Sequence, residues 1–292
     1  MKTIQVSKPG SPRKYPKSVN LQVVARVRPM TVTEIRGGAP RCLDINTNLQ
    51  EVLIKNQKRQ EAKAFTFNKV YGPSSTQEQI FDDTVSPCLD DVCKGYSCTL
   101  FAYGQTGTGK TYTMEGVKDE TLSPNICSSG AGIIPRSMHH LFERLERTHT
   151  NFAIRVSMLE LYNEKLIDLL STKDEDLTEQ SETLKIYENP DTGMPYVGNL
   201  TEIDVKCRTQ VFDILAQGSV KRTTAATQMN ANSSRSHCIF QAVVNIQQPD
   251  SETMTTGRLY LVDLAGSENI GRSGAKNLRA KEAGNINKSL LT

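Results

Sequence analysis

The feature that most constrains this chain is a glycine-rich stretch at 100–114, LFAYGQTGTGKTYTM, in which three glycines fall within six residues. Glycines crowded in this way cost conformational entropy, so the backbone must be approached closely or must adopt conformations closed to other residues. Four residues separate Gly104 from Gly109-Lys110-Thr111, which is the spacing of G-x-x-x-x-G-K-[ST]. The apolar run at 98–102 predicts a short buried strand before the loop, and a helix can follow it. The pattern therefore predicts a strand, a phosphate-binding loop and a helix.

Each residue type in this pattern has a chemical role at a phosphate. Glycines allow successive backbone N–H groups to turn toward phosphate oxygens, and the following helix adds its positive N-terminal end. The Lys110 ammonium would reach the β- and γ-phosphates, and the Thr111 hydroxyl would ligate Mg²⁺. We therefore predict that the chain binds a nucleotide together with Mg²⁺. The predicted phosphate-binding residues are Gly104, Gln105, Thr106, Gly107, Thr108, Gly109, Lys110 and Thr111.

A second stretch, RLYLVDLAGSE at 258–268, indicates how a phosphate would be sensed. An apolar strand ends at Asp263 and leads into a D-x-x-G pattern that closes at Gly266. A carboxylate at the end of a strand beside the loop can hold Mg²⁺, here through water. The Gly266 amide could contact a γ-phosphate, a contact that exists with ATP and is lost after hydrolysis. The stretch therefore predicts a nucleotide-dependent switch.

A third stretch, NANSSRSH at 230–237, is rich in hydroxyl groups. Serines at a phosphate site can complete Mg²⁺ coordination and orient an attacking water. Arg235 can supply a cation near the transferring group or pair with a carboxylate. On its own the stretch is typical of a serine-rich surface loop. Together with the other two stretches it indicates another switch.

The same stretches separate the classes of phosphate-loop protein. The guanine-binding pattern N-K-x-D does not occur, since Asn287-Lys288 is followed by Ser-Leu, and this favours ATP as the nucleotide. Both switch stretches fit hydrolysis by water, and no acceptor-binding module is evident. A small-molecule kinase is therefore disfavoured.

Composition limits what can surround the loop. The chain has 292 residues with 37% hydrophobic content, enough for one large α/β domain or at most two small ones. It has no run of 18 apolar residues, so no membrane-spanning helix is expected. Its seven cysteines include no C-x-x-C pair, which favours a reducing compartment over a disulfide framework or a metal cluster.

The net charge of +3 is distributed unevenly. Residues 1–17 contain five basic residues, three prolines and no acid, so this arm is expected to be disordered and the rest of the chain carries −2. The body is therefore not a general nucleic-acid binder. An anionic partner must be met by a local basic patch.

Hydrophobic periodicity predicts strands that alternate with helices after the arm. Strands are expected at 21–27, 152–158, 239–246 and 258–264, and helices from Ser74 or Ser75 to Gly95, from Pro135, and from Val211 to about Gly218. Such alternation around a phosphate loop predicts an α/β fold whose central sheet is mainly parallel, with helices on both faces. Residues 18–292 are interpreted as a single domain.

In their order and separations, the three stretches resemble the kinesin motor domain. The similarity covers nearly the whole chain after the arm, and its segments are RVRP (26–29), AGIIPR (131–136), LELYNEKLIDLL (159–170), KRTTAAT (221–227) and EAGNINKSLLT (282–292). GTGKTYTMEG, KRTTAAT-x-MNA and SENIGRSGA, with a long loop after the phosphate helix, look most like the bipolar mitotic (BimC-type, kinesin-5) subfamily. The resemblance implies a kinesin-like P-loop NTPase fold.

The resemblance also implies roles for residues outside the phosphate loop. Arg26, Arg28 and Pro29 would line the adenine, and Tyr112 would stack on it.

The resemblance makes the stretch at 230–237 a first switch and the stretch at 258–268 a second switch, and it implies a catalytic set drawn from both. Ser234 would lie near Mg²⁺ with Thr111 and Asp263, and Ser233 would help a water relay. Arg235 and Glu268 would form an ion pair that closes over the γ-phosphate and positions the lytic water. The implied catalytic residues are Ser233, Arg235, Gly266 and Glu268.

Kinesins similar to this one hydrolyse ATP to move along microtubules, and BimC-type members form antiparallel tetramers that slide spindle microtubules apart. The resemblance therefore implies a microtubule-stimulated ATP hydrolase of the cytoplasmic and spindle cytoskeleton, with a homotetrameric parent protein and neither nucleic acid nor membrane as a partner. The family pattern continues past the position of Thr292, so we expect an incomplete motor domain that lacks C-terminal elements and the coiled coil. An alternative is a microtubule- or nucleotide-binding fragment that does not cycle.

The surface that faces tubulin is expected in the segment after the second switch, GRSGAKNLRAKEAGNINKS at 271–289. This segment concentrates basic residues against one acid, Glu282, and so suits an acidic microtubule surface. An ordinary solvated loop and helix start is the simpler alternative. The predicted partner-binding residues are Arg272, Lys276, Arg279 and Lys281.

Overall fold

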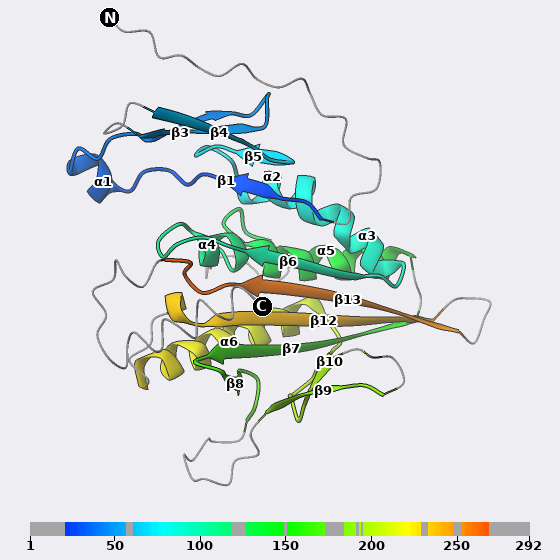
Figure 1. Ribbon diagram of the computed structural model, residues 1–292. Helices are drawn as coiled ribbons and strands as arrows, with labels where there is room; N and C mark the ends of the chain where they lie inside the picture. Colours follow the sequence, from blue (N-terminus) through cyan, green and yellow to red (C-terminus); the bar gives the residue numbers. More distant parts are fainter. Residues whose placement is uncertain are drawn as a thin grey trace, which may run out of the picture. The chain divides into compact units, whose positions relative to one another are not determined.

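The computed structural model describes residues 21–56, 61–117, 127–148, 151–172, 184–190, 193, 195–228, 233–247 and 253–268. The chain divides into two compact units, one ending at Thr76 and the other beginning at Gln77 (Figure 1). The arm predicted at 1–17 and the segment predicted to face tubulin lie outside the described residues. Within the described part, no helix combines the length and the apolar character needed to cross a membrane.

The described residues of the first unit form two small sheets and one short helix. β1 (Val24–Arg26) pairs in parallel with β5 (Lys69–Tyr71). β2 (Leu43–Asn46), β3 (Glu51–Asn56) and β4 (Glu61–Thr66) form an antiparallel sheet in that order. Helix α1 (Val32–Arg36) begins with a capping box, in which the side chains of Thr31 and Glu34 each accept a hydrogen bond from the other residue's amide.

The second unit is built on a six-stranded sheet. Its strands lie in the order β11 (Ile203–Val205), β7 (Phe152–Tyr162), β12 (His237–Gln247), β13 (Met254–Asp263) and β6 (Ser97–Ala102), and β8 (Lys165–Asp168) pairs with β7. β9 (Lys185–Glu188) and β10 (Pro195–Gly198) form a separate hairpin. The strands predicted at 152–158, 239–246 and 258–264 are therefore confirmed.

The prediction of a mainly parallel sheet is wrong for the described residues. β12 pairs antiparallel with both β7 and β13, and β8 and β11 pair antiparallel with β7. The parallel pairing in the described part of this sheet joins β13 to β6. β12 and β13 are separated by a few residues only, and a connection of that length joins antiparallel strands. The fold is thus α/β with a mixed sheet, and its parallel pair carries the phosphate loop.

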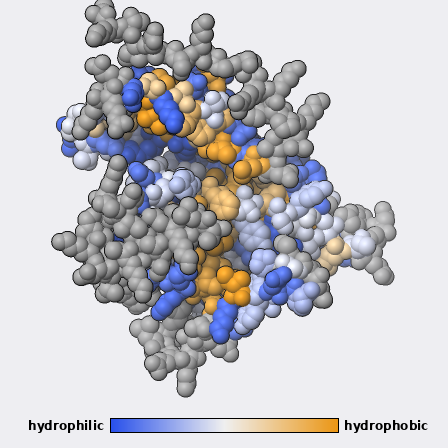
Figure 2. All heavy atoms as spheres, viewed as in Figure 1, coloured by the Kyte–Doolittle hydropathy of each residue, from blue (hydrophilic) through white to orange (hydrophobic). Residues whose placement is uncertain are grey.

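The described helices of this unit cover one face of the sheet, rather than both faces as predicted. Buried residues of α3 (Ser86–Cys93), α5 (Ile133–Thr148) and α6 (Arg208–Gln228) share a single core with strand residues such as Phe240 and Leu261, whose exposed fraction is 0%. Side chains that point the other way are more open, and Phe101 on β6 is 64% exposed. In the view of Figure 1, Figure 2 shows apolar side chains at several places on the surface.

Two helices differ from their predicted form. The helix predicted from Ser74 or Ser75 to Gly95 consists of α2 (Gln77–Ile80), a π-helical turn (Phe81–Val85) and α3. α6 continues through Gly218 instead of ending there. A Cβ atom at position 218 would lie 2.5 Å from Met158 Sδ, so this glycine permits close packing of the helix on β7.

Candidate functional site

The phosphate loop joins β6 to the short helix α4 (Lys110–Met114), as predicted. β6 is half exposed rather than buried, because it lies at the edge of the described sheet. Gly107 and Gly109 have φ angles of 79° and 94°, which glycine adopts without steric cost. The loop therefore needs glycine at these positions, and its two ends are fixed by regular elements.

Lys110 is held against the loop that it follows. Its Nζ donates to the carbonyl oxygens of Gly104 at 2.9 Å and Gln105 at 3.1 Å. Burial lowers the pKa of Lys110, while the carboxylates of Asp263 and Glu268 act in the opposite direction. The ammonium thus lies among the groups predicted to surround phosphate, as its predicted role requires.

The Thr111 hydroxyl meets the end of β13. Thr111 Oγ1 donates to Asp263 Oδ2 at 2.7 Å. Asp263 is buried, and within the described residues its second oxygen, Oδ1, has no hydrogen-bond partner. A buried carboxylate oxygen in this position calls for a cation or a water. The hydroxyl and the two carboxylate oxygens are the donor types that Mg²⁺ prefers, so the residues fit a Mg²⁺ site.

Beyond Asp263, four successive backbone amides bond to two stretches of the unit, the end of β6 with the phosphate loop and residues 234–237. The Leu264 N–H donates to Ala102 O of β6 at 3.2 Å, and the Ala265 N–H donates to His237 Nδ1 at 3.2 Å. The Gly266 N–H donates to Ser234 O at 2.7 Å, and the Ser267 N–H donates to Gly104 O at 3.1 Å. The second switch is therefore bonded to the phosphate loop and to the first switch.

Glu268 contacts the phosphate loop directly. Its Oε2 accepts the Thr106 amide at 3.0 Å, and its Oε1 accepts the Thr106 hydroxyl. Burial acts to raise the pKa of Glu268, but the hydrogen bonds from Thr106 and the Lys110 charge outweigh it, so the pKa is lowered overall. The partner predicted for Glu268 was Arg235. The described contacts of Glu268 instead place its carboxylate on Thr106, a donor of the phosphate loop.

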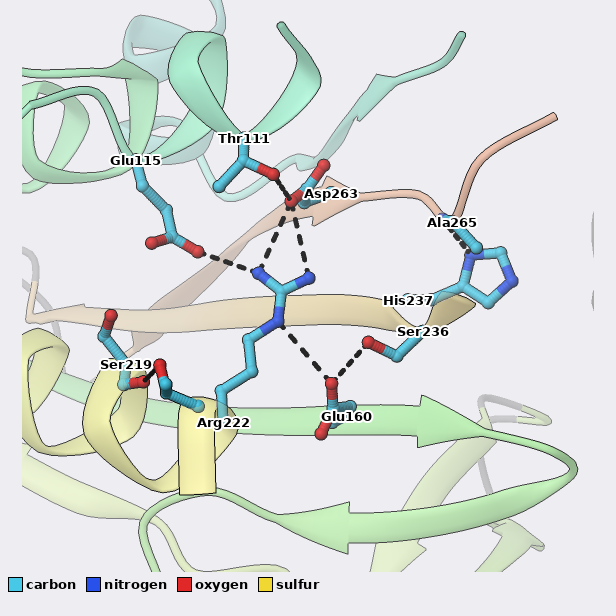
Figure 3. A network of polar contacts seen from close by, with 10 residues as sticks. Thr111, Glu115, Glu160, Ser219, Arg222, Ser236, His237, Asp263 and Ala265 are labelled. Atoms are coloured by element: carbon cyan, nitrogen blue, oxygen red, sulfur yellow. Dashed lines mark hydrogen bonds and ion pairs between the residues drawn. The ribbon is translucent and has the colours of Figure 1, made fainter. Parts of the chain in front are cut away.

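A buried arginine that the sequence analysis did not assign joins these elements (Figure 3). Arg222 of α6 pairs through Nη1 with Glu115 Oε1 at 2.9 Å and with Asp263 Oδ2 at 3.4 Å. Its Nε lies 3.5 Å from Glu160 Oε1 as an ion pair without hydrogen-bond geometry. Glu160 also accepts the Ser236 hydroxyl.

Three carboxylates surround the single positive charge of Arg222. Burial acts to lower the pKa of Arg222, but the surrounding carboxylates outweigh it and raise the pKa. The arginine therefore stays ionised at any physiological pH and fixes the side of Asp263 that faces α6. Arg222 falls within the KRTTAAT segment, yet its partners are 107, 62 and 41 positions away, so local sequence gave no sign of them.

The other predicted site residues are distributed as follows. Ser233 and Arg235 belong to a 3₁₀ turn (Ser233–Arg235) that leads into β12. Tyr112 is 45% exposed on α4, and its carbonyl accepts the Gln77 side-chain amide at 2.6 Å.

The residues predicted to line the adenine belong to the first unit. Arg26 ends β1. Arg28 pairs with Glu34 at 2.7 Å and donates to the carbonyl of Pro29. The predicted partner-binding residues Arg272, Lys276, Arg279 and Lys281 lie outside the described part of the chain.

Comparison with known proteins connects this geometry to one family. The kinesin motor domain family model matches residues 26–292. The chain is 44% identical over 299 residues to "Kinesin-like protein KIF11" of Mus musculus, covering 98% of this chain and 28% of that protein. It is 42% identical over 287 residues to "Kinesin-like protein KIN-5C" of Oryza sativa subsp. japonica, covering 94% and 28%.

A solved structure agrees with these relatives. The structure described as "Structure of a fast kinesin: Implications for ATPase mechanism and interactions with microtubules" superposes with a TM-score of 0.79 at 35% identity, covering 91% of this chain and 71% of that chain. The chain spans just over a quarter of the length of the curated relatives it matches, 28% for the mouse protein. The similarity to KIF11 and KIN-5C proteins agrees with the kinesin-5 resemblance. With its phosphate loop, the bonds that join 230–237 to the end of β13 and a family match over residues 26–292, the chain belongs to the kinesin motor domain family.

Proposed function

We propose that this chain is the catalytic part of a microtubule-stimulated ATPase motor. The observation that carries the proposal is the 2.7 Å hydrogen bond from Thr111 to Asp263, beside an Asp263 oxygen that has no hydrogen-bond partner among the described residues. The bond brings the end of the phosphate loop to the end of the strand before the second switch. A nucleotide with its Mg²⁺ would be held between these elements, and a phosphate-dependent change there would act on both.

The residues of the chain have separable tasks in this reaction. Lys110 would move its ammonium from the loop carbonyls to the phosphates and neutralise their charge. Thr111, Asp263 and Ser234 would hold Mg²⁺. When bound, Mg²⁺ would supply charge neutralisation at the phosphate oxygens. Gly266 would exchange the Ser234 carbonyl for a γ-phosphate oxygen as the acceptor of its amide.

Glu268 would alternate between two partners. In the described arrangement it is bonded to Thr106, whose amide is also a predicted phosphate donor. A phosphate at that amide would release the carboxylate, which could then pair with Arg235 and hold the lytic water with the help of Ser233. This alternation would couple arrival of ATP to assembly of the hydrolytic group.

The proposed partner is the microtubule. The mouse and rice relatives are named kinesin-like proteins, and the related solved structure is described in terms of its interactions with microtubules. For this chain we propose binding through Arg272, Lys276, Arg279 and Lys281, location in the cytoplasm on spindle microtubules, and a homotetrameric parent protein.

ATP turnover with and without microtubules tests the proposal. The full-length protein should hydrolyse Mg·ATP slowly alone and faster as polymerised tubulin is added. A chain that binds nucleotide and microtubules without turnover would instead be the non-cycling fragment of the alternative interpretation. Unpolymerised tubulin serves as the control for added protein, and GTP serves as the control for nucleotide selectivity.

A further inference from the structure

His237 stands at the point where the two switches meet. It is the first residue of β12 and the last residue of the first-switch stretch at 230–237. It is buried, with 5% of its surface exposed. Its Nδ1 accepts the amide of Ala265 in the second switch at 3.2 Å, and Figure 3 shows the ring beside that residue.

The four amides that leave β13 differ in the kind of acceptor they use. Those of Leu264, Gly266 and Ser267 donate to backbone carbonyls, which no substitution removes. The amide of Ala265 donates to a side chain. Ala265 has an exposed fraction of 0%, so its amide needs this partner, since an unpaired buried amide is costly. One side chain therefore secures the backbone immediately before Gly266.

We propose that His237 is a positioning residue for the γ-phosphate-sensing amide of Gly266. By accepting the Ala265 amide, the imidazole fixes the chain direction at Ala265, and the next amide is thereby aimed at the first switch, where it meets Ser234 O at 2.7 Å. The inference rests on the proposed ATPase function, because Gly266 is the group it positions.

The hydrogen bond from the Ala265 amide requires a particular protonation state of the His237 imidazole. Nδ1 can accept only when it carries no proton, so the imidazole must be neutral with its proton on Nε2. Burial lowers the pKa of His237, and the Asp263 carboxylate opposes this shift. From β7 the cross-strand neighbour is the apolar Leu161, and from the second switch the carboxylate that acts on the ring is that of Asp263. Protonation at acid pH would break the bond to Ala265.

Two substitutions separate the role of His237 as a hydrogen-bond acceptor from its role in filling buried space. His237→Asn places an amide oxygen near the position of Nδ1 that can accept but cannot be protonated. His237→Phe keeps an aromatic ring without an acceptor. His140→Asn is the matched control, because His140 lies on α5, pairs with Glu143 and stacks on Phe81, away from the switches.

The first measurement needs no nucleotide. Amide hydrogen exchange should show Ala265 protected in the wild-type protein and in His237→Asn, and at least tenfold less protected in His237→Phe. Equal protection in all three proteins would overturn the proposal, whether or not the chain hydrolyses ATP. This separates failure of the inference from failure of the proposed function.

The second measurement is single-turnover ATP hydrolysis between pH 5 and 8. Loss of one neutral hydrogen bond is worth about 0.5–1.5 kcal/mol, so His237→Phe should hydrolyse roughly 3- to 10-fold more slowly with nucleotide affinity nearly unchanged. His237→Asn should recover to within about twofold and should lack the acid decline expected of the wild-type protein, which the lowered pKa of His237 places below the ordinary histidine value of about 6.5. If His237→Phe does not fold, the pH profile of His237→Asn decides alone, and an acid decline matching the wild type would refute the proposal.

Discussion

Glu268 and Thr106 are 162 positions apart in the chain, yet the carboxylate of one accepts both the amide and the hydroxyl of the other. A carboxylate is thus bonded to a donor of the loop that is predicted to cradle phosphate. Since Oε2 and a phosphate oxygen would use the same amide, the two must compete for it. The strength of this contact should therefore control how readily nucleotide enters.

The first prediction concerns that competition. Thr106→Val removes the hydroxyl and keeps the amide, so Glu268 loses one of its two hydrogen bonds to Thr106. ATP should then associate roughly threefold to tenfold faster, as expected for the loss of one exposed hydrogen bond worth about 0.5–1.5 kcal/mol. Stopped-flow binding of a fluorescent ATP analogue measures this. Thr108→Val is the control, because the Thr108 hydroxyl donates to Gln105 O instead. Unchanged or slower association in Thr106→Val would count against the competition.

The same contact has a defined pH dependence. The pKa of Glu268 is lowered in the folded protein, so its contact with Thr106 contributes stability above the ordinary pKa of glutamate. That contribution is lost as the pH falls toward the lowered pKa. The difference in free energy of unfolding between the wild-type protein and Thr106→Val should therefore become smaller as the pH falls into the acid range.

The second prediction concerns Lys110. Lys110→Ala removes the charge that would neutralise the phosphates, and the full-length protein should lose about 10²-fold or more in ATP turnover. Lys94→Ala is the control, since Lys94 pairs with Asp91 on the exposed end of α3. Turnover within about twofold of the wild type would show that the loop is not catalytic.

The third prediction concerns the buried arginine. Arg222→Met leaves the carboxylates of Glu160 and Asp263 buried without their cation, and should destabilise the second unit by about 3–5 kcal/mol. Arg155→Met is a matched control, because Arg155 also pairs with two carboxylates but on the exposed surface, where about 0–1 kcal/mol is expected. Urea unfolding of both variants gives the two values, and similar values would contradict the buried network.

The fourth prediction concerns the packing of β13 on α3. A Cβ atom at Gly257 would lie 1.9 Å from Val92 O, which belongs to the helix backbone and cannot move alone. Gly257→Ala should therefore destabilise the protein by about 1–3 kcal/mol or more, measured by thermal unfolding. At Gly72 a Cβ would meet nothing within 4 Å, so Gly72→Ala should change stability by no more than about 0.5 kcal/mol.

The fifth prediction concerns the proposed microtubule contact. Neutralising Lys276, Arg279 and Lys281 together in the full-length protein should weaken microtubule binding and leave basal ATPase nearly intact. Exposed charges are screened beyond about 10 Å at 0.1 M ionic strength, so wild-type binding should also fall steeply with salt. Cosedimentation at several salt concentrations measures both effects. Binding that salt and the triple substitution leave unchanged would refute the assignment.

Local sequence was sufficient where the chemistry is local. The loop at 104–111 could be predicted because its glycine spacing is itself the binding geometry, and Asp263 could be predicted because an apolar strand ends there. The hydrogen bond that joins Thr111 to Asp263 confirms that the two stretches meet. By contrast, the helix end predicted at Gly218 was wrong. This glycine does not end the helix but leaves room for the Met158 side chain of β7.

Pairing between distant segments could not be predicted in the same way. Strand direction follows from connection lengths, and the short β12–β13 connection overrides the general rule for phosphate-loop folds. The partners of Arg222 and of Glu268 lie on other elements. The position of a charged residue in the sequence does not indicate which distant residue it will contact. His237 belongs to a predicted motif, but its role depends on an amide of the second switch.

The pairing of β13 with β6 limits where residues can be inserted or deleted without displacing the site. Asp263 lies opposite Ala102, so the residue that meets Thr111 and the start of the phosphate loop share one rung of the sheet. Inserting a single residue in β13 would move its end by about 3.3 Å and turn Asp263 to the opposite face, away from α4, and an insertion in β6 would displace the start of the phosphate loop by the same distance. Insertions and deletions should therefore accumulate in the loops and spare these two strands, because the strand lengths fix the position of Asp263 relative to the phosphate loop.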